Sequence, residues 1–391
     1  MSSTFLTIFL HRRAWRLTAV AVLVLLAAAI AGMRFQGGGG DSGEPSSDSG
    51  IRDAAGGTVT LPAEVERVLC SGSGCLRLLT YLQAHDRIVA VDSIETRGSP
   101  IDARPYAIAN PQFESYPVFG EFRGWDNPEL IAGLSPSPQL IFKIAAGRGQ
   151  DPAGLQAKTG IPVIPLDYGN LTNHRERLNG SLRRMARVMG SSRRAEEVIE
   201  YFDALENDLR ERTRDVPAGK RPSCYVAGLG HRGPHGVQST DPSFPPFMFT
   251  HARNVSAASF SDDLTHAMIS KEQLVAWDPE VIFLDVSTLR LPNDANALEQ
   301  LRQDPVYKSL SAVRNDKVYG LFPSNSYNRN FGTIFANAYF VGKTLYPERF
   351  ADIDPMAKAE EISTFLNGGA AFYVLNEQFD GLPFNSIEIT Q

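Results

Sequence analysis

The chain has 391 residues, of which 43% are hydrophobic and 21% charged. It is long enough for two domain cores and too apolar for a largely disordered protein. The 38 Lys and Arg residues against 44 Asp and Glu give a formal net charge of −6, so the charge balance predicts no nucleic-acid partner. The three cysteines, Cys70, Cys75 and Cys224, are too few for a disulfide-stapled scaffold or a zinc ribbon with paired CxxC motifs.

The N-terminus has the features of a targeting segment. A basic patch over residues 11–16 precedes an uncharged, apolar run from Leu17 to Met33. The run is short for a membrane-spanning helix and slightly long for a signal-peptide core, so a cleaved export signal and an uncleaved anchor both stay open. Residues 36–50 are rich in Gly, Ser, Asp and Pro, which predicts a flexible tether. In either case we expect the folded part to work outside the cytoplasm.

Alternating strand and helix patterns begin near Gly57. The first expected elements are a strand over 59–62, a buried strand over 67–70, a helix over 75–82, a strand over 88–91, a helix over 127–134, and buried strands over 139–142 and 161–166. The proline-free stretch 174–214 predicts two helices that break near Gly190, the second about 35 Å long over 192–214. A strand over 223–227 follows, and the helix–Pro–strand pattern of 130–142 recurs over 274–284. This repeat predicts two lobes of like architecture.

Four segments, in this order, resemble the iron-complex and vitamin-B12 class of ABC-transporter solute-binding proteins. They are residues 127–141 (NPELIAGLSPSPQLI), the long helix after Met189-Gly190, residues 271–284, and the PVY and NDKVY sequences within 305–319. The resemblance covers about residues 58–366 and implies two Rossmann-like, three-layer α/β lobes with parallel sheets, joined by a single long α-helix. The implied domains are a signal peptide or anchor with tether (1–50), an N-terminal lobe (51–172), linking helices (173–216) and a C-terminal lobe with a tail (217–391).

The same resemblance implies a non-enzymatic receptor. Such a receptor captures an iron complex, a metal chelate like a ferric siderophore, between its lobes and delivers it to a permease dimer in the membrane. The resemblance implies no catalytic residue, no protein-bound metal and no cofactor, and it implies a monomer. Two alternatives stay open: a molybdate or tungstate receptor of the same fold, and an extracytoplasmic metallochaperone or enzyme that uses His231, His235 and His251.

A ligand held between two such lobes would meet the loops at the carboxyl ends of the parallel strands. Aromatic side chains there can stack on a bulky chelate, and arginines can donate paired hydrogen bonds to its oxygens. Hydroxyls and backbone amides would suit an oxyanion instead. The candidate ligand-binding residues are Ser73, Arg104, Tyr106, Arg123, Arg148, His231, Tyr327 and Arg329. We expect Tyr106, Tyr327 and Arg329 to face a common cleft.

Two further loops have sequence features that bear on the site. The glycine-rich segment 228–236 (GLGHRGPHG) lacks the GK[ST] sequence of a phosphate-binding loop, and prolines follow where a dinucleotide fold needs a helix. We expect its backbone amides to approach the ligand, with His231 as a candidate contact. Cys70 and Cys75 bracket another loop, and both a disulfide and two buried thiols stay open.

The resemblance also implies one acidic docking residue on the outer side of each lobe, to be met by arginines of the permease. Glu129 lies in the short helix before the strand at 139, and Glu272 has the equivalent place before the strand at 281. The alternative is that each is an ordinary first-turn glutamate stabilised by the helix dipole.

Overall fold

The computed structural model describes residues 51–98, 102–144, 149–231, 233, 235–261, 263–289 and 296–389. The expected targeting segment and the candidate Arg148 lie outside these residues. Within the described ranges, no helix combines the length and apolarity needed to cross a membrane.

Two three-stranded sheets form the N-terminal lobe. Its elements are β1 (Val68–Ser71), α2 (Cys75–Tyr81), β2 (Val91–Asp92), α3 (Ser93–Thr96), α4 (Pro105–Ile108), β3 (Val118–Glu121), β4 (Trp125–Asp126), α5 (Pro128–Ala132), β5 (Leu140–Ile144), α6 (Pro152–Thr159) and β6 (Val163–Leu166). In the first sheet β5 pairs in parallel with β1 and β6, and in the second β2 and β3 are parallel while β4 is antiparallel. Every residue of β1 and β5 is buried, as expected for parallel strands covered on both faces.

The C-terminal lobe repeats this plan around a parallel four-stranded sheet with the order β12-β11-β7-β9. Its elements are β7 (Ser223–Ala227), β8 (Ser239–Thr240), α9 (Pro245–Phe249), β9 (Arg253–Asn254), β10 (Ala267–Met268), α10 (Lys271–Trp277), β11 (Val281–Asp285), α11 (Ala297–Gln303), α12 (Pro305–Lys308), α13 (Ser311–Arg314) and β12 (Val318–Leu321). Strands β8 and β10 form a separate antiparallel pair.

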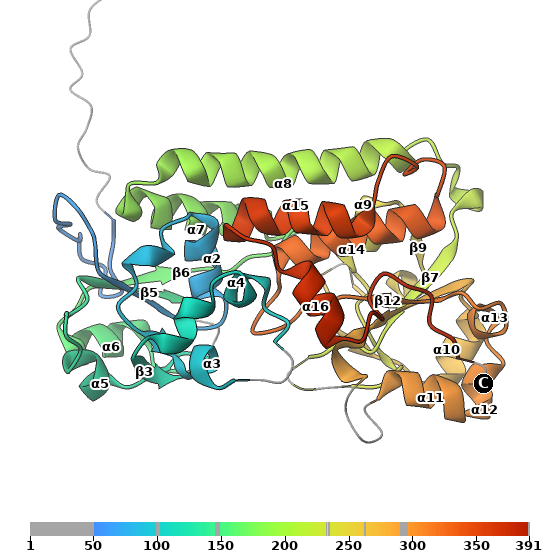
Figure 1. Cartoon of the computed structure of the whole chain (residues 1–391), viewed down its shortest axis with the longest axis horizontal. Helices are drawn as coiled ribbons and strands as arrows, with labels where there is room; N and C mark the ends of the chain where they lie inside the picture. The colour runs from blue at the N-terminus through green and yellow to red at the C-terminus, as the bar shows by residue number, and fades with distance from the viewer. Residues whose placement is uncertain are drawn as a thin grey trace, which may run out of the picture. The chain divides into compact units, whose positions relative to one another are not determined.

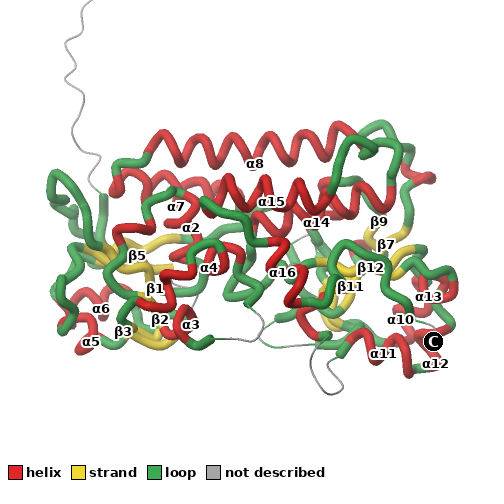
Figure 2. The backbone as a smooth tube through the Cα atoms, in the orientation of Figure 1, coloured by secondary structure: helices red, strands yellow, loops and turns green. Residues whose placement is uncertain are grey.

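A layer of long helices connects the lobes. These helices are α7 (Arg175–Met189), α8 (Ser192–Thr213), α14 (Phe331–Leu345) and α15 (Pro355–Asn367), and the short α16 (Phe372–Gln378) follows them. The predicted linking helix is confirmed as α8, 22 residues long, which runs above both lobes (Figure 1). Gly190, with φ 68°, ends α7 in the left-handed conformation that favours glycine. The two groups of strands lie apart beneath this layer (Figure 2).

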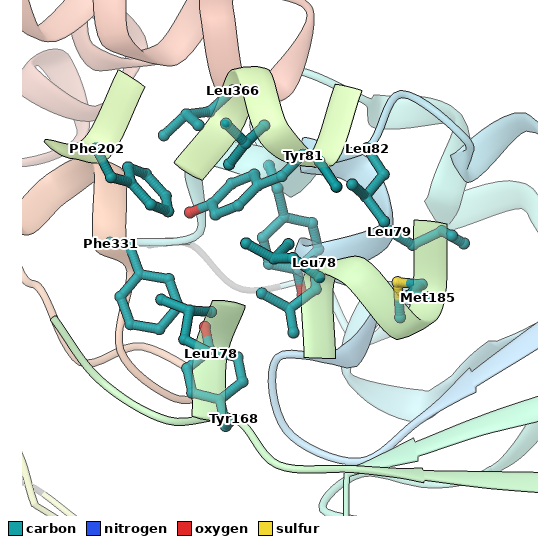
Figure 3. Packing of buried hydrophobic residues seen from close by; sticks show 14 of the residues in the cluster. Leu78, Leu79, Tyr81, Leu82, Tyr168, Leu178, Met185, Phe202, Phe331 and Leu366 are labelled. Atoms are coloured by element: carbon teal, nitrogen blue, oxygen red, sulfur yellow. The ribbon is translucent and has the colours of Figure 1, made fainter. Parts of the chain in front are cut away.

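The largest apolar cluster joins the helical layer to the N-terminal lobe. Tyr81 of α2, Phe202 of α8, Phe331 of α14 and Leu366 of α15 meet in it (Figure 3). The Phe202 ring lies edge-on to Tyr81 and Phe331, with centroids 6.1 and 6.2 Å away, an arrangement that aromatic pairs favour. Segments that follow the C-terminal sheet in sequence therefore complete the core around α2.

The strand expected over 59–62 is wrong. In this region Thr58 forms only an isolated bridge with Arg52, and Pro62 has no N–H to donate to a ladder. The strand expected over 88–91 is shorter in the structure, because β2 begins only at Val91.

Candidate functional site

Residues 324–330, called here the crossing loop, lie between β12 and α14 and contact both lobes. Tyr327 and Asn328 have φ values of 49° and 79°, a left-handed conformation that non-glycine residues keep only when their surroundings hold it. The Asn328 amide donates to the Ser73 carbonyl (2.9 Å). The Tyr327 hydroxyl donates to Asp92 and accepts from the Arg123 backbone N–H (2.9 Å). The N-terminal lobe thus holds the middle of this loop.

A cavity of about 170 Å³ lies between the crossing loop and loops of the C-terminal lobe. Its lining includes polar groups from four segments: Gly230, His231, Asp241, Thr265, His266, Asn325 and Arg329. Two of the residues predicted from sequence, His231 and Arg329, are therefore brought together here. Asp241 and His266 were not predicted, because neither lies in the loops that the strand pattern indicated.

Arg329 is only loosely held inside the cavity. Its Nη2 atom lies 3.5 Å from Asp241 Oδ2 and 3.4 Å from the Thr265 carbonyl, whereas charge-assisted hydrogen bonds usually measure about 2.7–2.9 Å. An anion entering the cavity can therefore compete for this guanidinium.

Asp241 is a nearly buried acid, with 6% of its side chain exposed. Burial raises its pKa to about 7, although the nearby Arg329 and a hydrogen bond from the Ser243 N–H lower it. The raised pKa favours the protonated carboxyl, which can donate a hydrogen bond to an anion.

Three histidines gather at one end of the cavity. The rings of His231 and His266 stack at 4.1 Å, and His235 Nε2 lies 2.8 Å from the His231 carbonyl. Burial and the two neighbouring histidines lower the pKa of His266 to about 4. Across the described residues, no three His, Cys, Asp or Glu side chains are arranged to hold a metal ion. His251, named in the metallochaperone alternative, instead pairs through Nδ1 with Thr213 of α8 (2.9 Å).

Arg104 and Tyr106 are engaged within the N-terminal lobe. The Arg104 guanidinium forms ion pairs with Glu95 (2.7 Å) and Asp102 (2.6 Å), and the Tyr106 hydroxyl donates to Glu95 (2.6 Å). Neither side chain is among the residues that line the cavity. Tyr106 and Tyr327 approach the same acidic segment, since their partners Glu95 and Asp92 are three residues apart.

The remaining candidates take other places. Arg123 is exposed, with its guanidinium over the Phe122 ring at 5.0 Å. Ser73 contributes its backbone carbonyl to the crossing loop, as described above.

All three cysteines are described, and each is a buried free thiol. Burial, together with the neighbouring Cys75, raises the pKa of Cys70 well above its usual range. Of the two states left open by the sequence, the structure has the buried thiols.

Sequence reasoning missed Arg77, which contacts the crossing loop from α2. The side chain is buried (1% exposed) and donates to the carbonyls of Ser326 (2.9 Å), Tyr327 (3.2 Å) and Arg329 (3.0 Å). The only sequence signal was a single arginine within the apolar sequence CLRLLTYL. This signal does not show that the arginine contacts the crossing loop.

Residues 68–324 match the family described as periplasmic binding proteins, and the chain belongs to this family. It is therefore an extracytoplasmic solute-binding component of an ABC transporter, and not an enzyme. The curated molybdate-binding protein MolA of Haemophilus influenzae is similar, with 24% identity over 321 residues that make up 76% of this chain and 84% of MolA.

Solved structures confirm the fold. The structure of MolA bound to molybdate has a TM-score of 0.62 at 20% identity and covers 83% of this chain and 99% of MolA. A periplasmic solute-binding protein of Veillonella parvula has a TM-score of 0.63 at 16% identity, with coverage of 85% and 96%. CeuE of Helicobacter pylori with Ni(II) bound has a TM-score of 0.55 at 16% identity, with coverage of 85% and 98%.

Proposed function

We propose that the protein captures a small oxyanion, of the molybdate and tungstate class, in the cavity beside the crossing loop. The observation that carries the proposal is the cavity's small volume, about 170 Å³, together with its polar lining and its loosely held Arg329. Pockets for drug-sized ligands measure about 300–1,000 Å³. The similarity to MolA, a molybdate-binding protein, supports the same ligand class.

The residues of the cavity suit an oxyanion chemically. Arg329 supplies positive charge and planar N–H donors, and Asp241 in its protonated form supplies an O–H donor. Asn325, whose amide donates to the Gly230 carbonyl (2.7 Å), ties the crossing loop to the glycine-rich loop. The ligand would thus be held by short polar contacts from both loops.

A ferric siderophore-like chelate is the second candidate, because the sequence resemblance implied it. The cavity is small for such a ligand, and the tyrosines expected to stack on it bond to acids instead: Tyr106 to Glu95 and Tyr327 to Asp92. We therefore place this ligand class second.

Calorimetric titration of the purified protein with molybdate, tungstate, sulfate and a ferric catecholate separates the two candidates. We expect saturable binding of molybdate or tungstate and none of the catecholate. Binding of the catecholate without binding of either oxyanion would overturn the proposal.

We also propose that Glu129 and Glu272 dock the protein on its permease. Both are exposed in the first turn of short helices, α5 and α10, which Asn127 and Ser270 cap through their side chains. Each helix precedes a buried strand, β5 or β11, so the two glutamates hold equivalent positions in the two lobes.

Charge reversal tests this docking pair. We expect Glu129→Lys combined with Glu272→Lys to abolish transporter-dependent uptake while ligand affinity stays unchanged, because both side chains lie outside the cavity lining. A matched control reverses two other exposed glutamates, Glu64→Lys with Glu388→Lys, and should leave uptake intact. Normal uptake by the first pair would mean that both glutamates serve only as helix starts.

A further inference from the structure

We infer that Arg77, on α2 of the N-terminal lobe, is a positioning residue that sets the place of Arg329 in the oxyanion cavity from across the interface between the lobes. The inference rests on the proposed function, because it assigns Arg77 a role in the same site. Arg77 is not among the cavity-lining residues, so it acts through the crossing loop and not by touching the ligand.

The contacts of Arg77 converge on the crossing loop. Nη1 donates to the Arg329 carbonyl and to the Tyr168 hydroxyl, and Nη2 donates to the carbonyls of Ser326 and Tyr327. The Tyr168 hydroxyl in turn donates to the same Arg329 carbonyl (2.6 Å). One guanidinium therefore fixes three backbone carbonyls of a loop that lies about 250 residues away in sequence.

The surroundings of Arg77 favour a geometric role over a stabilising one. Among the described residues, its hydrogen-bond acceptors are neutral carbonyls and a hydroxyl, with no carboxylate among them. Its charge also lies near the rings of Tyr106 (5.1 Å) and Tyr168 (5.9 Å). Burying a charge that has no carboxylate partner is costly; an apolar side chain would avoid that cost but would leave the three carbonyls without this donor. What an apolar side chain cannot supply is the planar set of donors.

The hydrogen bonds from Arg77 to the three loop carbonyls are called here the clamp. Arg329 links this clamp to the cavity. Its carbonyl is held at 3.0 Å by Arg77, whereas its guanidinium reaches Asp241 and Thr265 only at 3.5 and 3.4 Å. The backbone of Arg329 is thus held more tightly than its guanidinium. Tyr327 and Asn328, which precede Arg329, have left-handed backbone conformations. Such conformations persist only while surrounding contacts hold them, so the backbone relaxes when those contacts are lost. Loss of the clamp should therefore let the Arg329 guanidinium move out of register with the bound anion.

A double-mutant cycle with Arg77→Lys and Arg329→Gln tests the inference, with tungstate and molybdate as titrants in calorimetry. Lysine keeps the charge but loses the planar donors. We expect Arg77→Lys to weaken binding about tenfold when Arg329 is present and less than about twofold in the Arg329→Gln background. Equal losses in both backgrounds would overturn the inference, since a general loss of structure acts regardless of Arg329.

Arg194 offers a matched control. This arginine of α8 also donates to backbone carbonyls of other elements, those of Tyr81 and Phe365, but not to the crossing loop. Arg194→Lys should lower the melting temperature and leave oxyanion affinity unchanged. If Arg77→Lys does not fold, Tyr168→Phe removes one hydrogen bond to the Arg329 carbonyl and must show the same dependence on Arg329. Absence of oxyanion binding in the wild-type protein would overturn the proposed function itself. If the wild type binds but the effects of Arg77→Lys and Arg329→Gln simply add, only the role of Arg77 is overturned.

Discussion

Two basic side chains, Lys143 of the N-terminal lobe and Arg329 of the C-terminal lobe, are paired in opposite ways. In the N-terminal lobe, Lys143 is fully buried and donates to Asp126, to Ser71 Oγ (3.0 Å) and to the Gly124 carbonyl (3.2 Å). In the C-terminal lobe, Arg329 meets its acid only at 3.5 Å and does so beside a cavity. We therefore interpret the tightly paired Lys143 as a charge that holds the fold, and the loosely paired Arg329 as the charge of the proposed ligand site.

The strongest way to break this comparison is to remove the cation of the tight pair. Lys143→Met leaves Asp126 buried without its partner, so we expect the free energy of unfolding to fall by about 3–5 kcal/mol. Urea denaturation measures this loss. The folded fraction should keep its oxyanion affinity, because Lys143 does not line the cavity.

The exposed pair of Arg183 and Glu196, 2.8 Å apart, supplies the control. Arg183→Met should change the free energy of unfolding by no more than about 1 kcal/mol, because solvent screens such pairs. A similar loss in both variants would contradict the view that the Lys143 cluster holds the fold.

The second test removes the loosely paired cation. Arg329→Ala should weaken oxyanion binding by about 1.5–3 kcal/mol, the loss expected for hydrogen bonds to a charged group, which is roughly tenfold to 150-fold in the dissociation constant. Calorimetry measures the affinity, and Arg193→Ala, which removes an arginine whose side chain is 93% exposed, should not change it. Unaltered affinity in Arg329→Ala would remove Arg329 from the site.

The contrast between the lobes also shows what the sequence could predict. Buried parallel strands are continuous apolar runs, so β5, β7 and β11 were located closely, and the proline-free stretch around Gly190 located α8. Loops after strands were accessible to the same reasoning, and the candidates His231 and Arg329 from two such loops line one cavity. Tyr106 and Tyr327, which were expected to face a common cleft with Arg329, are not among its lining residues.

Pairing between side chains was not predictable in the same way. The candidate Arg104 is engaged by Glu95, and nothing in the spacing of these two residues shows that they meet in the core. Asp241 and Arg77 were missed because their roles depend on the crossing loop, which lies far from both in sequence. Which charged side chains find a partner therefore depends on tertiary contacts, and the sequence pattern does not show these contacts.

The smallest expected effect concerns Asp241 and pH. With a pKa of about 7, its carboxyl is neutral below that pH and negative above it, so it should repel a dianion increasingly as pH rises. We expect the wild-type affinity for tungstate to fall by at most about tenfold per pH unit above 7. Asp241→Asn cannot ionise, so its affinity should stay level and exceed that of the wild type at pH 8.

Other groups at the cavity require a matched set of variants. Burial and the neighbouring histidines lower the pKa of His266 to about 4, so this side chain is already neutral in this range. His266→Gln should therefore leave the slope of affinity against pH unchanged. His231 also lines the cavity, so His231→Gln completes the set. If the slope survives Asp241→Asn and disappears in His231→Gln, the proton that governs binding resides on the imidazole and not on the buried acid.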